Sequence, residues 1–436
     1  MIQDVVLPVF HTRQAEIYRQ RGKFNTVRCG RRWGKTLAMV TIACDAAAKG
    51  RRVGLFTPEH KQLQEPYEQI LSILQPIKQR ASKTEGTIRT VNGGLVDFWT
   101  LNDNELAGRG REYDLVMIDE AAFTKNGQMM GIWERSIQPT MVTRPNSSAW
   151  MFSTPNGNDP ENFFWLLCND AKLKSEFVEH YAPTSSNPYV PAAELEKERE
   201  RKHPLIFQQE FLAEFVDFSG VAFFSIDKLL VEGKPVAYPR GCDQVLAVVD
   251  CAAKDGTEHD GTAVSFWALS TIAANSLVCL DWDIVVIEGA TLETWIPNIA
   301  RRCEDLAKEC RARFGSGGIW IEDASAGTIL LQQCSNRGIS AQALPSILTA
   351  KGKDGRAMNA IDPVHRGEVK ISEYAFDKND VSFKGVTRNH FLSQVSGFRI
   401  GDKGAARRAD DLLDTFCYAI GITLGDQNGI TGVMRA

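Results

Sequence analysis

The chain has 436 residues, more than the roughly 250–300 that one hydrophobic core supports, so two compact domains are expected. Its hydrophobic content of 43% and charged content of 24% are ordinary for a globular protein. The sequence has no apolar run of about 18 residues, so a membrane span is not expected. The formal net charge of −4 excludes a chain-wide basic surface for nucleic acid, although a local basic patch is compatible with it.

The chain begins without the charged start and long apolar stretch of a signal peptide, which favours a cytosolic protein. None of the ten cysteines forms a Cys-x-x-Cys pair, so reduced and mostly buried thiols are expected. Up to residue 190, short apolar runs alternate with helical stretches, which predicts α/β layering with a largely parallel sheet. The expected strands are 25–28, 53–56, 95–99, 115–118 and 149–152.

Residues 191–240 are predicted to be a helical segment and linker. A charged helical stretch, 192–214, is followed by prolines and glycines just before the second domain, 241–436. There, a second α/β pattern begins. Its expected elements are strands 245–249, 263–268 and 277–286, helix 293–313, strand 318–321 and a closing helix 410–422. Three strands, a helix, a strand and later helices are the order of an RNase-H-like nuclease, by analogy of fold.

Residues 29–36, CGRRWGKT, follow the first predicted strand and open an apolar helix. A phosphate loop needs this context, because backbone amides and the helix dipole bind the phosphates there. Lys35 is expected to reach the β- and γ-phosphates of ATP, and the Thr36 hydroxyl to hold Mg²⁺. Gly34 fits the usual pattern, but Cys29 replaces its first glycine and Gly30 follows one step later.

The apolar strand 115–118 ends in two carboxylates, Asp119 and Glu120. Asp119 is expected in the magnesium shell, and Glu120 is expected to orient and activate the attacking water. Solvated acids commonly end buried strands, but here the pair follows a phosphate loop in the right order. The next apolar strand ends in Ser153 and Thr154 before a proline, which is where a P-loop motor couples the γ-phosphate to motion.

For two candidates near the nucleotide site, the sequence favours a functional role and a purely structural role equally. Gln14, upstream of the phosphate loop, is either an adenine-reading side chain or a solvated helix residue. Arg109 and Arg111, in the segment GRGR at 108–111, lie just before the carboxylate-bearing strand. They form either an arginine finger, which reaches the γ-phosphate of a neighbouring subunit, or a basic surface loop.

The second domain carries carboxylates at the ends of its predicted elements. These are Asp250, Glu322, Asp323, Asp410, Asp411 and Asp414. Spacings of three and four place the last of them on one helical face, and the set is expected to bind two divalent ions. Oxygen ligands suit Mg²⁺ or Mn²⁺. The alternative is that solvation and helix dipoles favour acids at such positions. The choices between Glu322 and Asp323, and among the three late aspartates, stay open.

A glycine-containing loop, 350–356, carries Lys351, Lys353 and Arg356. Basic side chains in a loop close to a nuclease site are suited to binding the phosphate backbone of DNA. A flexible solvated loop is an equal alternative.

Several of these segments resemble the ATPase motifs of the terminase large subunits of tailed bacteriophages. The replaced first glycine of the phosphate loop is usual in that family. The segments are GRRWGKT at 30–36, IDEA at 118–121, FSTPNG at 152–157, SNPY at 186–189 and FQQEF at 207–211.

The resemblance implies a P-loop (RecA/ASCE-like) ATPase domain followed by an RNase-H-like nuclease domain. It implies that ATP and Mg²⁺ drive double-stranded viral DNA into a preformed capsid, and that a nuclease with two Mg²⁺ or Mn²⁺ ions cuts the DNA. It also implies Arg109 as the trans-acting finger and Arg31 or Arg32 as a phosphate sensor. The implied partners are a capsid portal, a terminase small subunit and further copies in a ring, usually pentameric. The implied location is the host cytoplasm and, transiently, the procapsid, with none in the mature virion.

Two other interpretations compete with this one. A DNA-repair or restriction helicase–nuclease has the same two sites, but such helicases carry two RecA-like lobes and this chain has room for one. An ATP-regulated structural or DNA-binding protein with inactive sites is disfavoured because Lys35, Asp119, Glu120 and Asp250 are all present.

Overall fold

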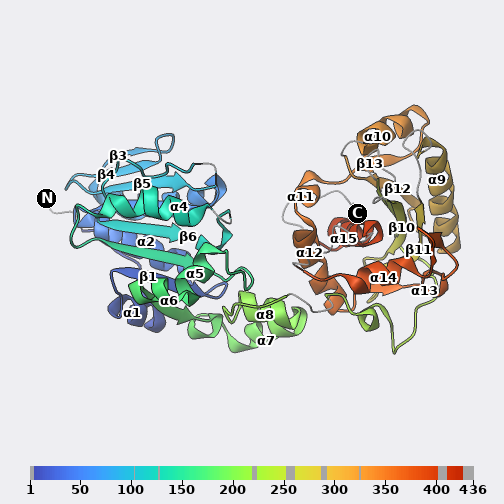
Figure 1. Ribbon diagram of the computed structural model, residues 1–436, viewed down its shortest axis with the longest axis horizontal. Helices are drawn as coiled ribbons and strands as arrows, with labels where there is room; N and C mark the ends of the chain where they lie inside the picture. Colours follow the sequence, from blue (N-terminus) through green and yellow to red (C-terminus); the bar gives the residue numbers. More distant parts are fainter. Residues whose placement is uncertain are drawn as a thin grey trace. The chain divides into compact units, whose positions relative to one another are not determined.

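The structure, a computed structural model, describes most of the chain. The described residues are 4–102, 104–125, 128–218, 223–251, 261–285, 292–323, 326–400 and 410–425. The chain divides into two compact units, the first comprising Met1–Glu200 and Pro204–Asp217, and the second Arg201–His203 and Phe218–Ala436. Each unit has its own sheet (Figure 1). Within the described ranges, no helix has the length and apolar character needed to cross a membrane.

An eight-stranded sheet forms the first unit, in the order β3-β4-β5-β2-β6-β7-β1-β8. Its strands are β1 (Phe24–Cys29), β2 (Arg52–Thr57), β3 (Lys78–Ser82), β4 (Thr87–Thr90), β5 (Leu95–Thr100), β6 (Leu115–Asp119), β7 (Ser148–Ser153) and β8 (Phe177–Ala182). The pairs β3–β4 and β4–β5 are antiparallel and all others are parallel. The largely parallel sheet predicted from the sequence is confirmed.

Both faces of this sheet are covered. Its helices are α1 (Thr12–Arg19), α2 (Lys35–Ala48), α3 (Gln64–Leu74), α4 (Met129–Ile132), α5 (Phe163–Asn169), α6 (Ala171–Glu176), α7 (Ala192–Arg201) and α8 (Pro204–Glu210). Trp150 of β7 belongs to one core and its neighbour Met151 to the other, because successive strand residues point to opposite faces. Burial on both faces explains why these strands read as continuous apolar runs.

One predicted helix of the linker region is divided. The stretch 192–214 forms two helices, α7 and α8, with the break before Pro204. Proline has no backbone N–H and its ring clashes with the preceding helical turn, so it begins α8 and does not continue α7.

The second unit is built on a six-stranded sheet in the order β13-β12-β9-β10-β11-β14. Its strands are β9 (Gln244–Asp250), β10 (Thr262–Leu269), β11 (Leu277–Val285), β12 (Ser316–Ile321), β13 (Ala341–Ala343) and β14 (Val369–Ile371). The first three form an antiparallel meander, and β12 runs parallel to β9. This is the expected order of three strands, a helix and a strand.

Helices surround this second sheet. They are α9 (Leu292–Glu309), α10 (Ala326–Asn336), α11 (Ser346–Thr349), α12 (Lys353–His365), α13 (Glu373–Asp377), α14 (His390–Gly397) and α15 (Asp411–Thr423). α15 is buried along its whole length and packs against α12, α14 and the sheet (Figure 1). The prediction of a loop over residues 350–356 is wrong for residues 353–356, because α12 begins at Lys353.

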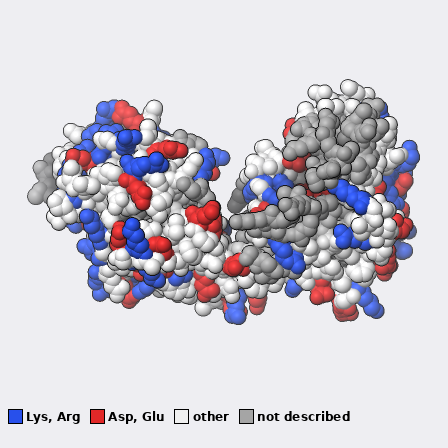
Figure 2. All heavy atoms as spheres, in the orientation of Figure 1, with Lys and Arg blue, Asp and Glu red and all other residues white. Residues whose placement is uncertain are grey.

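The surface charges and the cysteines are arranged as the sequence predicts. Lys and Arg lie interspersed with Asp and Glu over the face shown in Figure 2, in keeping with the net charge of −4. All ten cysteines are free thiols, nine of them buried and Cys251 half-buried. The expected reduced and mostly buried thiols are confirmed.

Candidate functional site

The loop 29–36 joins β1 to α2 as the sequence predicts. Gly34 caps the helix with a φ of +96°, a left-handed conformation that favours glycine. A Cβ at this position would also lie 2.8 Å from Gln14 Nε2. The first turn of α2 therefore depends on glycine at position 34, and this turn positions Lys35 and Thr36, both half-buried.

Gln14 holds the end of this loop. Its side chain is buried, its Nε2 donates to the Gly34 carbonyl over 2.9 Å, and its Oε1 accepts from the His11 N–H over 3.1 Å. The expectation of a solvated helix residue is therefore wrong. The adenine-reading role stays a prediction, since both ends of the amide already bind the chain itself.

The other side of the loop rests on the segment after β8. A Cβ on Gly30 would lie 2.4 Å from Thr184 Oγ1 and 2.5 Å from the Phe211 carbonyl, so no larger residue fits there. Thr184 Oγ1 donates to the Arg31 carbonyl over 2.7 Å, and Asn187 Nδ2 donates to the Arg32 carbonyl over 2.8 Å. These bonds fix the loop backbone. The sequence identified Asn187 within a motif, but not what it contacts.

The two arginines of the loop differ in their surroundings. Arg31 Nε lies 2.5 Å from the Glu210 carboxylate, and the Arg31 N–H donates to the Glu210 carbonyl. Arg32 is exposed and has a left-handed φ of +60°. Arg31 thus links the loop to α8, whereas the Arg32 side chain faces solvent.

Lys35 meets the two predicted carboxylates. Its Nζ lies 3.3 Å from Asp119 Oδ1 and donates a short hydrogen bond to Glu120 Oε1. Burial opposes the charge of Lys35, but Asp119 and Glu120 outweigh it, so the pKa of Lys35 is raised. Burial also raises the pKa of Glu120, against the effect of Lys35. Glu120 has a left-handed φ of +50°, a strained backbone of the kind found at functional sites.

β7 lies between β1 and β6, so its end is beside both the loop and the carboxylates. Ser153 Oγ donates to Glu120 Oε2 over 3.4 Å and accepts from the Ala122 N–H over 3.1 Å. Thr154 is buried next to it. The structure therefore brings Lys35, Asp119, Glu120 and Ser153 together at the carboxyl edge of the parallel sheet.

The predicted arginine pair separates into two environments. Arg109 is exposed between Gly108 and Gly110, which both have left-handed φ values. Arg111 Nε lies 3.6 Å from Asp97 Oδ2, and its guanidinium lies 5.9 Å from the Trp99 ring centroid. Arg109 is therefore the one presented outward, while Arg111 binds within the unit.

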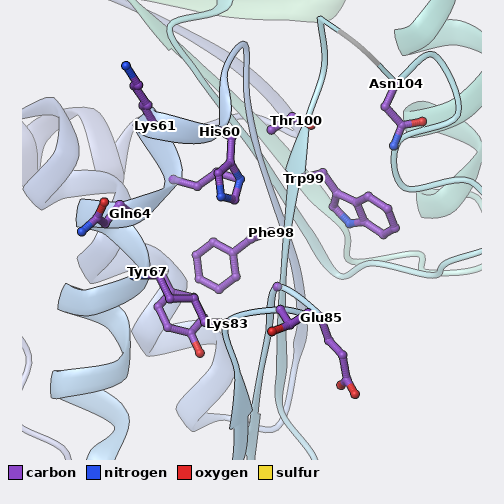
Figure 3. A pocket seen from close by; sticks show the side chains of 13 residues that line it. His60, Lys61, Gln64, Tyr67, Lys83, Glu85, Phe98, Trp99, Thr100 and Asn104 are labelled. Atoms are coloured by element: carbon purple, nitrogen blue, oxygen red, sulfur yellow. The ribbon is translucent and has the colours of Figure 1, made fainter.

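A hollow of about 260 Å³ lies elsewhere in the first unit, beside α3 and β5 (Figure 3). Tyr67 and Phe98 meet there edge-on with ring centroids 5.1 Å apart, and Trp99 leaves the opposite face of β5. His60 and Lys83 also line the hollow. None of the predicted site residues lines this hollow.

In the second unit, carboxylates from three elements approach one another. Asp250 ends β9, and Glu322 follows β12 one step beyond the paired residues Ile321 and Val249. α15 carries Asp411 and Asp414, both buried. Burial raises the pKa of Asp250 well above its usual value, and Asp414, Asp411 and Glu322 raise it further. The carboxylates share one region because β9 and β12 are neighbouring parallel strands and α15 packs against β9.

Two predicted DNA-gripping residues lie against this cluster. Lys353 Nζ donates a short hydrogen bond to Asp410 Oδ2 and lies 3.8 Å from Asp414 Oδ2. Arg356 Nη2 donates to Asp414 Oδ1 over 2.6 Å, and its guanidinium lies 4.9 Å from the Tyr418 ring centroid. The expectation of a flexible solvated loop is therefore wrong for both of them.

The remaining candidates lie further out. Asp323 is exposed, and its Oδ1 accepts a hydrogen bond from Thr328 Oγ1 over 2.7 Å. The charge of Glu322, by contrast, raises the pKa of Asp250. Lys351 is exposed. Of the two adjacent acids, Glu322 is the one directed to the cluster.

Carboxylate oxygens match the ligand preference of Mg²⁺ and Mn²⁺, and a divalent ion would offset the repulsion that Asp414, Asp411 and Glu322 exert on Asp250. Within the ranges that the structure describes, no three ligating side chains are grouped closely enough to hold an ion as they stand. The chemistry of the cluster therefore suits divalent ions, while its present geometry is held by Lys353 and Arg356.

The chain was compared with known proteins. Residues 28–230 match the family described as "Terminase large subunit, T4likevirus-type, N-terminal". The terminase large subunit of Escherichia phage T5 is 26% identical over 207 residues, which cover 47% of this chain and 46% of that protein. That of Thermus virus P23-45 is 24% identical over 331 residues, covering 71% of this chain and 62% of that protein. The matched regions thus span about half to three fifths of these relatives.

Solved structures agree in fold. The large terminase of a thermophilic bacteriophage superimposes with a TM-score of 0.66 at 13% identity, over 96% of this chain and 100% of that one. The complex of the same terminase with ATP-γ-S gives a TM-score of 0.64 at 14% identity, also over 96% and 100%. The fold is that of these large terminases, with two α/β domains, and the first domain brings a phosphate-type loop together with a pair of carboxylates. Residues 28–230 match the terminase large-subunit family, and the resemblance that the motifs predicted is confirmed.

Proposed function

We propose that this chain hydrolyses ATP to move double-stranded viral DNA into a preformed capsid and cuts that DNA with a two-metal endonuclease. The observation that carries the proposal is the convergence of Lys35, Asp119, Glu120 and Ser153 on a phosphate loop, in a chain whose second unit has its own carboxylate cluster. The family match over residues 28–230 supports this role.

In the ATPase reaction, the loop amides and Lys35 bind the β- and γ-phosphates, while Thr36 and Asp119 hold Mg²⁺. When phosphate takes Lys35, Glu120 loses its cationic partner and is free to orient the attacking water. Ser153, the last residue of β7, is hydrogen-bonded to Glu120 and therefore couples the presence of the γ-phosphate to the position of this strand. The residues proposed around the nucleotide are Gln14, Gly30, Arg31, Arg32, Gly34, Lys35, Thr36, Asp119, Ser153 and Thr154.

In the nuclease reaction, Asp250, Glu322, Asp411 and Asp414 hold two divalent ions, either Mg²⁺ or Mn²⁺. When bound, these ions supply an activated water and stabilise the leaving 3′-oxygen. Asp410 and Asp323 extend the acidic set, and the exposed Lys351 is the most accessible of the proposed contacts to a DNA phosphate.

Assembly follows from the same proposal. Copies of the chain form a ring, with five as the expected number, on the portal of the procapsid in the host cytoplasm. The terminase small subunit delivers the DNA. The exposed Arg109 acts as the finger that reaches the γ-phosphate bound by a neighbouring copy.

Plasmid cleavage by the purified chain in Mn²⁺, Mg²⁺ and EDTA tests the nuclease, with Asp250→Ala as the inactive comparison. Metal-dependent cutting that disappears in the variant supports the proposed site. The absence of cutting with either metal would reduce the second unit to a docking or DNA-binding module. ATP hydrolysis stimulated by empty capsids then separates a packaging motor from a helicase–nuclease.

A further inference from the structure

The acidic cluster of the second unit contains cations from its own chain. Lys353 and Arg356 lie three residues apart at the start of α12, which packs against α15 (Figure 1). Together they bind the carboxylates of Asp410, which immediately precedes α15, and of Asp414 in its first turn. The two helices thus meet through opposite charges at the point where the proposed nuclease ions bind.

The contact between Arg356 and Asp414 is shielded from water, which sets it apart from ordinary surface pairs. The Arg356 and Asp414 side chains are 13% and 9% exposed. Water and salt screen such a pair weakly, and removing one partner leaves a buried charge uncompensated. The carboxylate of Asp414 also faces Asp250, whose pKa it raises. A positive charge at this place therefore offsets repulsion among the acids.

The two cations differ in how firmly they are held. The Arg356 guanidinium is fixed on three sides, by the Asp414 carboxylate, by the Lys351 carbonyl at 3.1 Å and by the Tyr418 ring. The Lys353 side chain is 32% exposed, and the contacts of its ammonium are with carboxylates. An ammonium on a flexible stem exchanges partners more readily than a planar guanidinium held at several points.

We propose that Lys353 is an exchangeable counter-ion, which occupies the acidic cluster in the absence of metal and leaves Asp410 and Asp414 when a divalent ion binds, while Arg356 stays and positions Asp414. This inference rests on the proposed nuclease function. It makes Lys353 and the ion mutually exclusive ligands of the same carboxylates, so each weakens the binding of the other.

A direct DNA contact by Lys353 makes the opposite prediction. In that case, loss of the ammonium weakens DNA binding and leaves metal affinity unchanged. In the counter-ion arrangement, loss of the ammonium strengthens metal binding in the absence of any DNA. Metal affinity without DNA therefore distinguishes the two roles.

The experiment is a Mn²⁺ titration of the full-length, nucleotide-free protein, followed by calorimetry and by the electron paramagnetic resonance of free Mn²⁺. The site of interest is the binding that Asp250→Asn removes. Lys353→Met is expected to bind Mn²⁺ at this site about tenfold more tightly than the wild type. Lys351→Met is the matched control, because it removes the same charge from an exposed position two residues away, and it is expected to bind as the wild type does.

Thermal unfolding gives a second readout. In EDTA, Lys353→Met is expected to unfold at a lower temperature than the wild type, because the acids have lost a counter-ion, and Mn²⁺ is expected to raise its unfolding temperature by more. Should Lys353→Met not fold in EDTA, Lys353→Gln, which keeps a hydrogen-bond donor without the charge, takes its place.

Unchanged or weaker Mn²⁺ affinity in a folded Lys353→Met or Lys353→Gln protein overturns the counter-ion role, provided that the wild type shows the Asp250-dependent site. The absence of that site from the wild type at saturating Mn²⁺ overturns the proposed nuclease function instead. The two failures are thus distinguishable.

Discussion

The two units solve the same electrostatic problem in different ways. In the first, the carboxylates of Asp119 and Glu120 at the end of β6 are neutralised by Lys35, which belongs to the loop expected to bind phosphate. In the second, the carboxylates of α15 are neutralised by Lys353 and Arg356 from a neighbouring helix. An anionic ligand draws Lys35 toward itself, whereas a cationic ligand displaces Lys353. Removing the lysine is therefore expected to weaken ligand binding in one unit and to strengthen it in the other.

The largest expected effect separates the units by activity. Lys35→Ala removes the cation that contacts the transferred phosphate, and ATP hydrolysis is expected to fall by about 100-fold or more. Metal-dependent plasmid cleavage by the same protein is expected to be unchanged. Lys49→Ala is the matched control, since Lys49 ends the same helix, is 64% exposed and pairs with Asp45. Loss of cleavage along with hydrolysis, in a folded protein, contradicts two independent sites.

A second prediction concerns the metal-free stability of the acidic cluster. Burial and three nearby carboxylates raise the pKa of Asp250, so its ionised form destabilises the folded unit as the pH rises above the unfolded pKa of about 4. Asp250→Asn is therefore expected to raise the unfolding temperature in EDTA at neutral pH by about 2–4 °C, as about 1 kcal/mol does in a unit of this size. It is also expected to abolish cleavage. A lower unfolding temperature in calorimetry contradicts the crowding of negative charge.

In the first unit, by contrast, it is a low pH that is expected to lower the stability of the fold. His180 is buried, with Nε2 3.2 Å from Asn25 Oδ1, and burial, followed by Arg13, lowers the pKa of His180 from 6.5 to about 4. Its stabilising contribution is present above pH 6.5 and is lost as the pH falls toward 4. About 2 kcal/mol is expected to be lost at pH 5.

Calorimetry at pH 7.5 and pH 5 measures this loss in the transition that ATP stabilises. His180→Phe keeps an aromatic ring against Trp150, whose centroid lies 6.1 Å from that of His180, but does not titrate. Its pH dependence is expected to be flatter than that of the wild type. An equally steep loss in the variant assigns the acid sensitivity to another group.

The smallest expected effect concerns the support of the phosphate loop. Asn187→Ala removes the hydrogen bond to the Arg32 carbonyl, worth about 1 kcal/mol, and is expected to raise the KM for ATP about fivefold. Asn169→Ala is the control, because Asn169 is exposed on α5 and donates to the Trp165 carbonyl in its own helix. Steady-state ATPase kinetics measure both, and an unchanged KM in Asn187→Ala excludes this bond from nucleotide binding.

Sequence patterns predicted the sheets well where strands are buried on both faces. The polar edge strand β3, KQRAS, was missed because it is half exposed and has no apolar run. Strand ends located the carboxylates, since the ends of parallel strands share one edge of a sheet. The pairs that Lys353 and Arg356 make with Asp410 and Asp414 join residues 57 and 58 positions apart, and no local pattern encodes such a pairing.

The contacts around the phosphate loop show the same limit. Thr184 and Asn187 bond to the carbonyls of Arg31 and Arg32 across 153 and 155 residues of sequence. The sequence indicates a turn at that segment, because serine, asparagine and proline follow one another there. Which backbone atoms the turn supports depends on the packing of β8 beside β1, which the sequence does not display.

The burial of the cysteines has a practical consequence for labelling chemistry. Nine of the ten thiols are buried, and burial raises the pKa of the half-buried Cys251, so little of that residue is present as the reactive thiolate at neutral pH. Maleimide dyes are therefore expected to react slowly with the native chain. A single cysteine introduced at an exposed position such as Lys351 becomes a selective attachment point, so fluorescence can follow α12 without first removing the natural thiols.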